Sequence, residues 1–252
     1  MKVSIITVSY NSEKTINDTL QSIKSQVYKD IELIIIDGGS IDGTLKVIHN
    51  YADIISYYKS EPDKGIYDAM NKGLRVATGE IIGFLNSDDY YPSNDVILNV
   101  VKNITLSKAD AVYSNLNYVH SNKLYITRVW KSSMPPKNAF QNSWVPPHPT
   151  FFAKKNFYDE VGEYDRNFKY AADFDLLLRF FINKSRKIMY YNQTWVHMRE
   201  GGTTNNNLKV IFLQNKEILD SLSKAGINHS IIIFIFKKIH SRVMQRILSF
   251  SK

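Results

Sequence analysis

The chain of 252 residues is 44% hydrophobic and 22% charged, and it contains no cysteine. This composition is that of a folded globular protein, and it excludes a disulfide scaffold and a thiolate metal site. The formal net charge of +8 favours an anionic partner such as a phosphorylated substrate, nucleic acid or lipid headgroups.

The first third of the chain alternates strand patterns with helix patterns. Apolar, β-branched runs predict strands over 3–10, 31–36, 53–58 and from 81 toward two acids at 88 and 89. Apolar residues at helical spacing predict helices over 16–23, 45–51 and 65–77. This alternation predicts an α/β fold with right-handed βαβ units and a mostly parallel sheet flanked by helices.

Two of these predicted strands end in acids. Asp37 follows the second strand, and Asp88 and Asp89 follow the fourth. Because ligands of open α/β sheets bind beyond the carboxyl ends of the strands, we expect these acids at a ligand site. Adjacent carboxylates repel each other unless a cation neutralises them, and their oxygens suit Mg²⁺ or Mn²⁺. The alternative is a turn in which Asp88 or Asp89 caps the next helix.

Two common nucleotide-binding motifs are missing from the sequence. The turn after the first strand is Ser9-Tyr10-Asn11-Ser12 rather than G-x-G-x-x-G, which weighs against a dinucleotide-dependent oxidoreductase. No G-x-x-x-x-G-K-[ST] occurs, which weighs against a P-loop NTPase. A nucleotide held mainly by acids and a metal is the interpretation that remains.

Four segments follow one another in an order and at a spacing typical of one family. They are Thr7 to Asn11, Ile36 to Thr44, Glu61 to Gly73 and Gly79 to Asp89. Together they resemble glycosyltransferase family 2, the inverting nucleotide-sugar transferases of GT-A fold, strongly up to residue 92 and more weakly to about 205. The resemblance implies a GT-A catalytic domain over 1–205, with a nucleotide-binding half (1–92) and an acceptor half (93–205).

The resemblance also implies roles in the donor site. It assigns the nucleotide pocket to Thr7, Ser9, Tyr10, Asp37, Lys64 and Asp88. Asp89 would bind the Mn²⁺ or Mg²⁺ that bridges the diphosphate of a UDP-sugar. Structural alternatives stay open: Tyr10 as a core residue, Asp37 as a turn former and Lys64 as a solvated side chain.

A general base is implied in the second half, where strands are predicted over 110–118 and 124–130 with a hairpin turn at 120–123. The apolar residues that follow Asp173 predict a helix with this acid in its first turn, and the family's base occupies a similar place. The family commonly has Glu-Asp there, whereas this chain has Ala172-Asp173. Asp175 is the rival base or sugar contact, although we expect it to pair with Arg179 four residues on.

Three further residues are candidates for sugar or metal contacts. The resemblance places His148 near the acceptor or donor sugar, with a packed loop residue as the alternative. His197 is a candidate metal ligand, because late histidines bind metal in some GT-A enzymes. The stretch 199–204 is predicted to be mobile and to close over the diphosphate, with Arg199 supplying charge.

The last part of the chain, 206–252, is predicted to be a basic amphipathic helical extension. Residues 208–222 predict one helix that ends near Gly226. Residues 229–252 combine apolar side chains with lysines and arginines, a pattern suited to an anionic membrane surface. The alternative is a helix packed on the catalytic domain or on a second subunit, as in a homodimer.

The sequence also supports an expectation about localisation. Its start lacks the apolar segment of a signal peptide, and no apolar run approaches the roughly 18 residues of a membrane span. We therefore expect a cytoplasmic protein that lies peripherally on the inner face of the cell membrane.

These interpretations combine into one functional prediction. The chain is expected to be a metal-dependent inverting glycosyltransferase that moves a sugar from a UDP-sugar to a hydroxyl of a glycan or lipid-linked oligosaccharide. The expected setting is bacterial surface polysaccharide biosynthesis, such as that of O-antigen. The alternative is a catalytically inactive family member that acts as a membrane scaffold. Nucleic acid is not an expected partner, because acids rather than interleaved basic and aromatic residues cluster at the strand ends.

Overall fold

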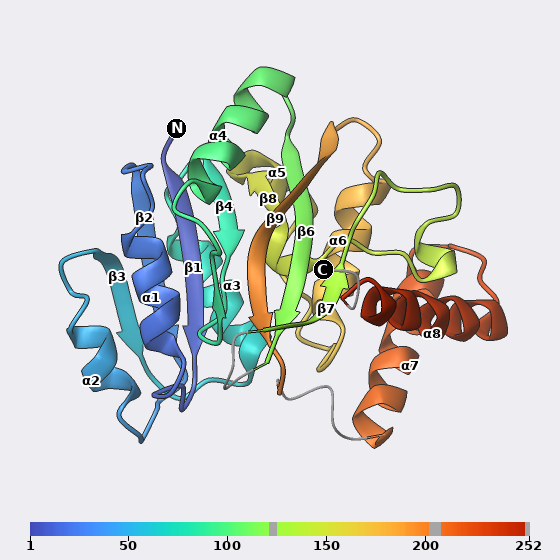
Figure 1. The fold of residues 1–252 in the computed structure, drawn as a ribbon. Coiled ribbons are helices and arrows are strands. Elements are labelled where there is room, and N and C mark those ends of the chain that lie inside the picture. The colour runs from blue at the N-terminus through green and yellow to red at the C-terminus, as the bar shows by residue number, and fades with distance from the viewer. Residues whose placement is uncertain (121–124, 202–207, 250–252) are drawn as a thin grey trace.

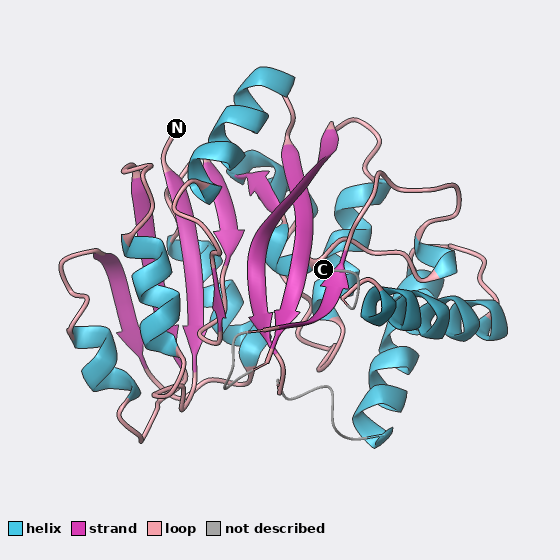
Figure 2. Ribbon diagram, viewed as in Figure 1, coloured by secondary structure: helices cyan, strands magenta, loops and turns pink. Residues whose placement is uncertain are grey.

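The computed structural model describes residues 1–120, 125–201 and 208–249. Within them, nine strands form one mixed sheet with helices on both faces, as Figure 2 shows. The strand order is β3-β2-β1-β4-β8-β6-β9-β5, and β7 pairs with β6. The predicted α/β fold is confirmed.

The first half of the chain builds the parallel part of the sheet. Strand β1 pairs in parallel with β2 and β4, and β2 pairs in parallel with β3. All seven residues of β1 are buried, as expected for a strand covered on both faces. The bounds are β1 Val3–Ser9, α1 Ile16–Lys24, β2 Ile31–Asp37, α2 Thr44–His49, β3 Ile55–Ser60, α3 Ile66–Val76 and β4 Ile81–Phe84.

Alternate residues of the parallel strands enter two separate cores. Ile6 of β1 packs on one face with Met70 and Leu74 of α3. Ile5 of β1 packs on the other face with Leu20 of α1. This alternation follows from the two-residue period of a strand, and it fixes the register of the sheet relative to its helices. The carboxyl ends of β1, β2, β3 and β4 consequently lie along one edge (Figure 1).

The second half of the chain adds the mixed part of the sheet. Strand β6 runs antiparallel to β7 and β8 and parallel to β9, and the short β5 pairs antiparallel with β9. The bounds are β5 Asp89–Tyr90, α4 Val96–Ser107, β6 Ala111–Val119, β7 Ile126–Trp130, η1 Phe140–Asn142, η2 His148–Thr150, β8 Phe152–Lys154, α5 Lys155–Val161, α6 Ala172–Ile182 and β9 Ile188–Arg199.

The predicted strand before the two acids is shorter than expected. It ends at Phe84, and a turn follows in which Asp89 N donates to Asn86 O over 3.0 Å. Asp89 and Tyr90 then form the two-residue strand β5 at the edge of the sheet, and Pro92 follows it in the chain. An edge position suits this segment because proline cannot donate a ladder hydrogen bond.

Two helices follow the sheet, α7 (Leu208–Lys224) and α8 (Ile231–Ile247), as the sequence predicts. Helix α7 contacts α6, and α8 contacts β7 and η1. Figure 1 shows α8 running beside β7. In the described part of the chain, no helix is both long and apolar enough to cross a membrane. Residues 121–123 of the predicted hairpin turn and 202–204 of the predicted mobile stretch lie outside the described residues.

Candidate active site

The turns after β1, β2 and β4 are joined by hydrogen bonds at the carboxyl edge of the sheet. Asn11 N donates to Ser40 Oγ over 2.8 Å, and Ile41 N donates to Asn11 Oδ1 over 3.0 Å. The hydroxyls of Ser12 and Ser87 lie 2.8 Å apart. The structure therefore brings together three of the four segments that carry the family resemblance.

Asp37 organises the middle of these turns. Its side chain is 0% exposed and accepts hydrogen bonds from the hydroxyls of Ser9, Ser40 and Ser60 and from the N–H groups of Gly39 and Ser40. Burial alone would raise the pKa of Asp37, but these hydrogen bonds outweigh it and lower the pKa. The turn-forming role of Asp37 is thus observed, while its contact with a nucleotide stays a prediction.

The other predicted nucleotide residues differ in accessibility. Thr7 is fully buried, and its hydroxyl has no hydrogen-bond partner. Ser9 is buried, and its hydroxyl donates a hydrogen bond to Asp37. Tyr10 is 62% exposed, so the alternative of a core residue is wrong. Lys64 is exposed as well, near the start of α3. Tyr10 and Lys64 are therefore the ones that a ligand can reach without rearrangement of the fold.

Asp89 is a buried carboxylate whose oxygens are not satisfied. It is 0% exposed, and neither side-chain oxygen has a hydrogen-bond partner. Burial raises the pKa of Asp89 well above its usual range, and the charge of the neighbouring Asp88 raises it further. Burial raises the pKa of Asp88 too. A buried acid without partners is costly unless a cation compensates it.

A divalent cation fits these oxygens. Carboxylates are the ligands that Mg²⁺ and Mn²⁺ prefer. Among the described residues, however, no group of three or more acids and histidines could hold a metal by itself. A cation at Asp89 would accordingly take its remaining ligands from water or from the phosphates of a donor.

Asp173 lies opposite α3, in the first turn of α6. Its Oδ1 accepts hydrogen bonds from Tyr67 Oη over 3.1 Å and from Phe174 N over 2.9 Å. Tyr67 stacks on Tyr164, with ring centroids 5.6 Å apart. Asp173 therefore sits at the end of an aromatic wall built from both halves of the chain.

His148 belongs to the same wall. Its Nε2 lies 2.7 Å from Tyr164 Oη, and its ring lies 5.7 Å from that of Phe84. Burial lowers the pKa of His148, although the charge of Asp173 partly opposes this shift. The ring is therefore neutral at neutral pH. Tyr164 and Tyr67 connect His148 to Asp173, and the sequence interpretation overlooked both tyrosines, although Tyr67 lies within the Glu61–Gly73 motif.

Comparison with known proteins decides the family. A family model described as Glycosyl transferase family 2 matches residues 4–181 of this chain. The chain belongs to glycosyltransferase family 2. It is a glycosyltransferase enzyme, and it has relatives that act in bacterial polysaccharide and glycolipid biosynthesis.

Two curated relatives of this glycosyltransferase have informative names. The PGL/p-HBAD biosynthesis glycosyltransferase of Mycobacterium bovis is 27% identical over 252 residues, covering 96% of this chain and 93% of that protein. WfaP of Escherichia coli, a UDP-Glc:alpha-D-GlcNAc-diphosphoundecaprenol beta-1,3-glucosyltransferase, is 39% identical over 136 residues, covering 54% of this chain and 52% of that protein.

Solved structures of glycosyltransferases share the fold. TarS of Staphylococcus aureus, solved with UDP-GlcNAc, superimposes with a TM-score of 0.69 at 20% identity, covering 88% of this chain and 66% of that one. The mannosyltransferase PcManGT of Pyrobaculum calidifontis, solved with GDP-Man and Mn²⁺, gives a TM-score of 0.67 at 16% identity, covering 99% of this chain and 74% of that one. At these identities the likeness establishes the GT-A fold alone.

Asp175, the rival base in this glycosyltransferase, is fully engaged elsewhere. Its Oδ2 accepts from Arg179 Nε over 2.9 Å, and its Oδ1 accepts from Ser221 Oγ of α7 over 2.8 Å. The predicted pair with Arg179 is confirmed. Asp175 thereby ties α6 to α7, and Asp173 is the better placed of the two acids to act as a base.

His197 lies away from Asp89 in this structure. On β9 it pairs with Tyr90, whereas Asp89 pairs with the next residue, Met198. Successive side chains of a strand point to opposite faces, which separates His197 from Asp89. His197 Nδ1 instead lies 3.3 Å from Tyr90 Oη, and the two rings meet edge to face. Local sequence could not reveal this, since the face depends on the register of β5 against β9.

Arg199 holds the turn that carries the acids. It is 6% exposed, forms an ion pair with Asp18 of α1 and donates to Asp88 O over 3.1 Å. Its guanidinium also lies over the ring of Tyr90, 5.1 Å from the centroid. We therefore expect Arg199 to position the Asp88–Asp89 turn, and its contact with a diphosphate stays a prediction.

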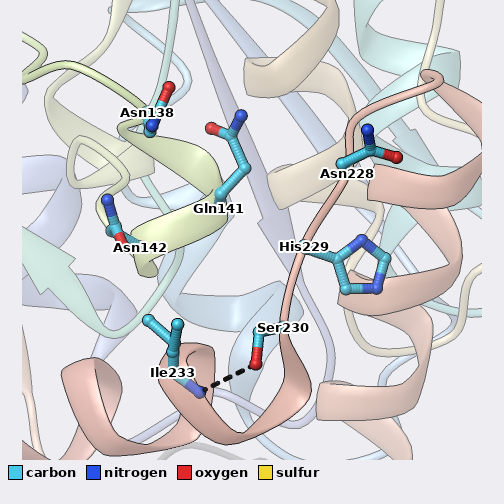
Figure 3. Close-up of a pocket in the computed structure, with 7 residues that line it drawn as sticks. All are labelled: Asn138, Gln141, Asn142, Asn228, His229, Ser230 and Ile233. Carbon is cyan, nitrogen blue, oxygen red and sulfur yellow. Dashed lines mark hydrogen bonds between the residues drawn. The ribbon is translucent and has the colours of Figure 1, made fainter.

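A separate hollow of about 300 Å³ lies between η1 and the start of α8 (Figure 3). Its lining is rich in side-chain amides and includes no carboxylate: Asn138, Gln141, Asn142, Asn228, His229, Ser230 and Ile233. It provides no carboxylate to act as a base or metal ligand, and the candidate active site remains at the sheet edge.

Proposed function

We propose that this enzyme transfers a sugar from a UDP-sugar, with inversion, to a hydroxyl of a lipid-linked glycan in bacterial surface polysaccharide biosynthesis. The observation that carries the proposal is Asp89, a buried acid with two unpaired oxygens at the carboxyl edge of the sheet. The UDP and UDP-GlcNAc bound by TarS support a UDP-sugar donor. The activity for which WfaP is named, transfer to a sugar on diphosphoundecaprenol, supports a diphosphate-linked lipid acceptor.

Asp89 is the residue that would hold Mn²⁺ or Mg²⁺, with Asp88 directed to the ribose. When bound, such a cation stabilises the negative charge that grows on the leaving diphosphate. The other nucleotide contacts would come from Thr7, Ser9, Tyr10, Asp37 and Lys64. Arg199 would supply positive charge near the diphosphate. The exposed Tyr10 and Lys64 are the first of these to test.

Asp173 is proposed as the general base. Within the described residues only its Oδ1 accepts hydrogen bonds, which leaves Oδ2 available to a substrate. Asp173 would take the proton of the acceptor hydroxyl while that oxygen forms a bond to the anomeric carbon. The bond from this carbon to the phosphate oxygen breaks at the same time, and UDP leaves with the electron pair. A single displacement of this kind inverts the anomeric centre.

The outward face of α8 supports a peripheral position on the inner surface of the cell membrane. Ile232, Phe236 and Ile239 are 81%, 66% and 58% exposed, and Val243 and Ile247 continue the same stripe at helical spacing. Exposed apolar stripes of this length are rare on soluble monomers. The lysines and arginines beside the stripe favour an anionic lipid surface. A second copy of the chain is the competing occupant.

The test of the proposed function is donor binding across UDP-, GDP- and dTDP-sugars with Mn²⁺, Mg²⁺ or EDTA. The variants are Asp89→Asn and, as a matched control, Asp53→Asn, which changes an exposed acid in the turn between α2 and β3. We expect metal-dependent binding of one UDP-sugar to wild type and to Asp53→Asn, and loss of the metal dependence in Asp89→Asn. Equal binding by Asp89→Asn would refute the assignment of the metal ligand.

A further inference from the structure

Helix α8 turns two of its cationic side chains toward the protein and an apolar stripe outward. Lys238 and Arg242 are half-buried on the side that also carries the buried Phe234, whereas the apolar stripe that begins at Ile232 is exposed. A surface helix of a soluble protein normally has the opposite arrangement. The charges on the inner face therefore need an explanation separate from the apolar stripe.

The inner face of α8 packs near a further cation on β7. Ser249, just after α8, donates through Oγ to Thr127 O over 3.0 Å, which fixes the end of the helix against β7. The neighbouring Arg128 lies over the ring of Tyr118, 3.5 Å from its centroid, and its Nε is buried without a hydrogen-bond partner. Burial lowers the pKa of Arg128, and the charges of Arg242 and Arg246 lower it further.

These cations have little compensating charge. The cations concerned are Arg128, Lys238, Arg242 and Arg246. Among the described residues, no carboxylate oxygen lies within 4.0 Å of a side-chain nitrogen of any of them. Lys238 instead donates to Asn215 Oδ1 over 2.6 Å. Bringing like charges together in a partly buried space costs free energy, which an anionic ligand would recover.

The cluster shares a face of the sheet with Asp89. Cross-strand pairs run from Arg128 on β7 to Tyr118 on β6, then to Met198 on β9 and to Asp89 on β5. Directly paired residues point to the same face, so these four side chains form one row. Three strand spacings separate the ends of the row, about 14 Å. The side chains of Tyr118 and Met198 occupy the row between Asp89 and the cluster.

We propose that Arg128, Lys238 and Arg242 bind the phosphate or diphosphate group of the acceptor. The inference rests on the proposed function, since it takes the donor diphosphate to be at Asp89. From the bound phosphate, the acceptor's lipid chain would extend along the exposed apolar stripe of α8. The same helix would then hold the acceptor's charge on its inner face and its membrane on the outer face.

The test measures binding of farnesyl diphosphate, inorganic pyrophosphate, UDP and phosphatidylglycerol vesicles to the full chain. Arg242→Gln and Lys238→Gln each remove one inward charge, and Lys237→Gln removes an exposed charge from the same helix as a matched control. We expect affinity for farnesyl diphosphate and pyrophosphate to fall at least tenfold in the inward variants and less than twofold in the control. Affinity for UDP with Mn²⁺ should not change.

Three results would overturn the inference. Unchanged farnesyl diphosphate affinity in both inward variants would refute the proposed site. An equal loss of UDP affinity in these variants would instead assign the cluster to the donor diphosphate. Loss of binding only to phosphatidylglycerol vesicles, with farnesyl diphosphate unaffected, would make the cluster a lipid headgroup site. Failure of the proposed function can be distinguished from failure of this inference. In the first case wild type would not bind UDP-sugars, while its farnesyl diphosphate binding could still be measured.

Discussion

Tyr67 on α3 donates a hydrogen bond to Asp173 on α6 over 3.1 Å, and this bond joins the two halves of the active site. Tyr67 belongs to a motif of the nucleotide-binding half, whereas Asp173 is the proposed base of the acceptor half. The stacking of Tyr67 on Tyr164 fixes the direction of the hydroxyl. The proposed base is therefore oriented by a residue from the first half of the chain.

Tyr67→Phe should reduce kcat by about tenfold, because Asp173 loses a positioning hydrogen bond while the ring stacking remains. KM for the donor should change less than twofold. Tyr57→Phe, at an exposed position of β3, is the matched control and should behave as wild type. Steady-state kinetics at fixed donor concentrations measure both parameters. A rise in donor KM with unchanged kcat would contradict the positioning role.

Asp173→Asn and Asp175→Asn should separate catalysis from stability. Loss of a general base lowers kcat by about 10²–10⁴-fold, so we expect Asp173→Asn to lose turnover and keep donor affinity. Asp175→Asn weakens the contacts with Arg179 and Ser221 and should lower the free energy of unfolding by about 2 kcal/mol. Turnover assays and urea unfolding of both variants test this contrast. Equal loss of turnover at equal stability would reopen the choice of base.

Much of the parallel half of the fold follows from local sequence. The apolar runs of β1 and β2 predict buried strands, and the polar turn at Asp37 marks where the second one ends. The helices α7 and α8 are also predicted by their periodicity. Periodicity reveals an amphipathic helix, but it does not say which face meets the protein. The inward charges of Lys238 and Arg242 could therefore not be predicted.

The candidate site was predictable only where it depends on local turns. Asp37 and Asp89 occur at strand ends that the sequence reveals. The face of His197 depends on pairing between β5 and β9, which are more than 90 residues apart, and β5 is too short for a sequence signal. The burial of Arg199 depends on an ion pair with Asp18, which is 181 residues away in the chain. Such relationships arise from tertiary packing and leave no periodic pattern.

Glu32 should give the fold a stability that is lost in acid. Burial would raise its pKa, but hydrogen bonds from Ser4 and Thr78 and the charge of Lys2 lower it to about 2. A group with a depressed pKa stabilises the fold above its unfolded value, here 4.5, and this stabilisation is lost as the pH falls toward 2. Because solvent screens this partly exposed carboxylate, we expect about 1 kcal/mol of stabilisation at pH 7.

Urea unfolding between pH 7 and pH 3 measures this dependence. Glu32→Gln should be less stable than wild type at pH 7, and the difference should shrink at pH 3. Asp53→Asn, at an exposed position, serves as the control and should follow the wild-type curve more closely. A constant difference between Glu32→Gln and wild type over this range would show that the loss is one of packing rather than of charge.

Lys238 should make anion binding depend on pH. Burial and the charge of Arg242 lower its pKa to about 8, while the charge of Asp173 on α6 partly opposes them. Asn215 of α7 accepts its hydrogen bond, and Phe234 lies beside it on its own helix. Lys238 is cationic below about pH 8 and neutral above it. Farnesyl diphosphate affinity should therefore fall as the pH rises from 7 to 9, and Lys238→Arg should flatten the profile.

Glu217 of α7 should support catalysis from outside the active site. Its carboxylate accepts hydrogen bonds from three consecutive backbone N–H groups just before α6, those of Lys169, Tyr170 and Ala171, over 3.0, 2.7 and 3.0 Å. These bonds fix the start of the helix whose first turn holds Asp173. An acid at a helix N-terminus is also favoured by the helix dipole.

Glu217→Ala should consequently lower both stability and turnover. Loss of a charged acceptor for these partly exposed donors costs about 1.5 kcal/mol, and a displaced base should reduce kcat by about tenfold or more. Asp220→Ala, one turn on and exposed, is the matched control on the same helix and should change neither quantity appreciably. Glu217→Gln, whose amide oxygen can accept some of the same bonds, should recover part of the turnover. If Glu217→Ala were destabilised but kept full kcat at a temperature where it is folded, α7 would contribute only to stability, because Asp173 would have kept its position without it.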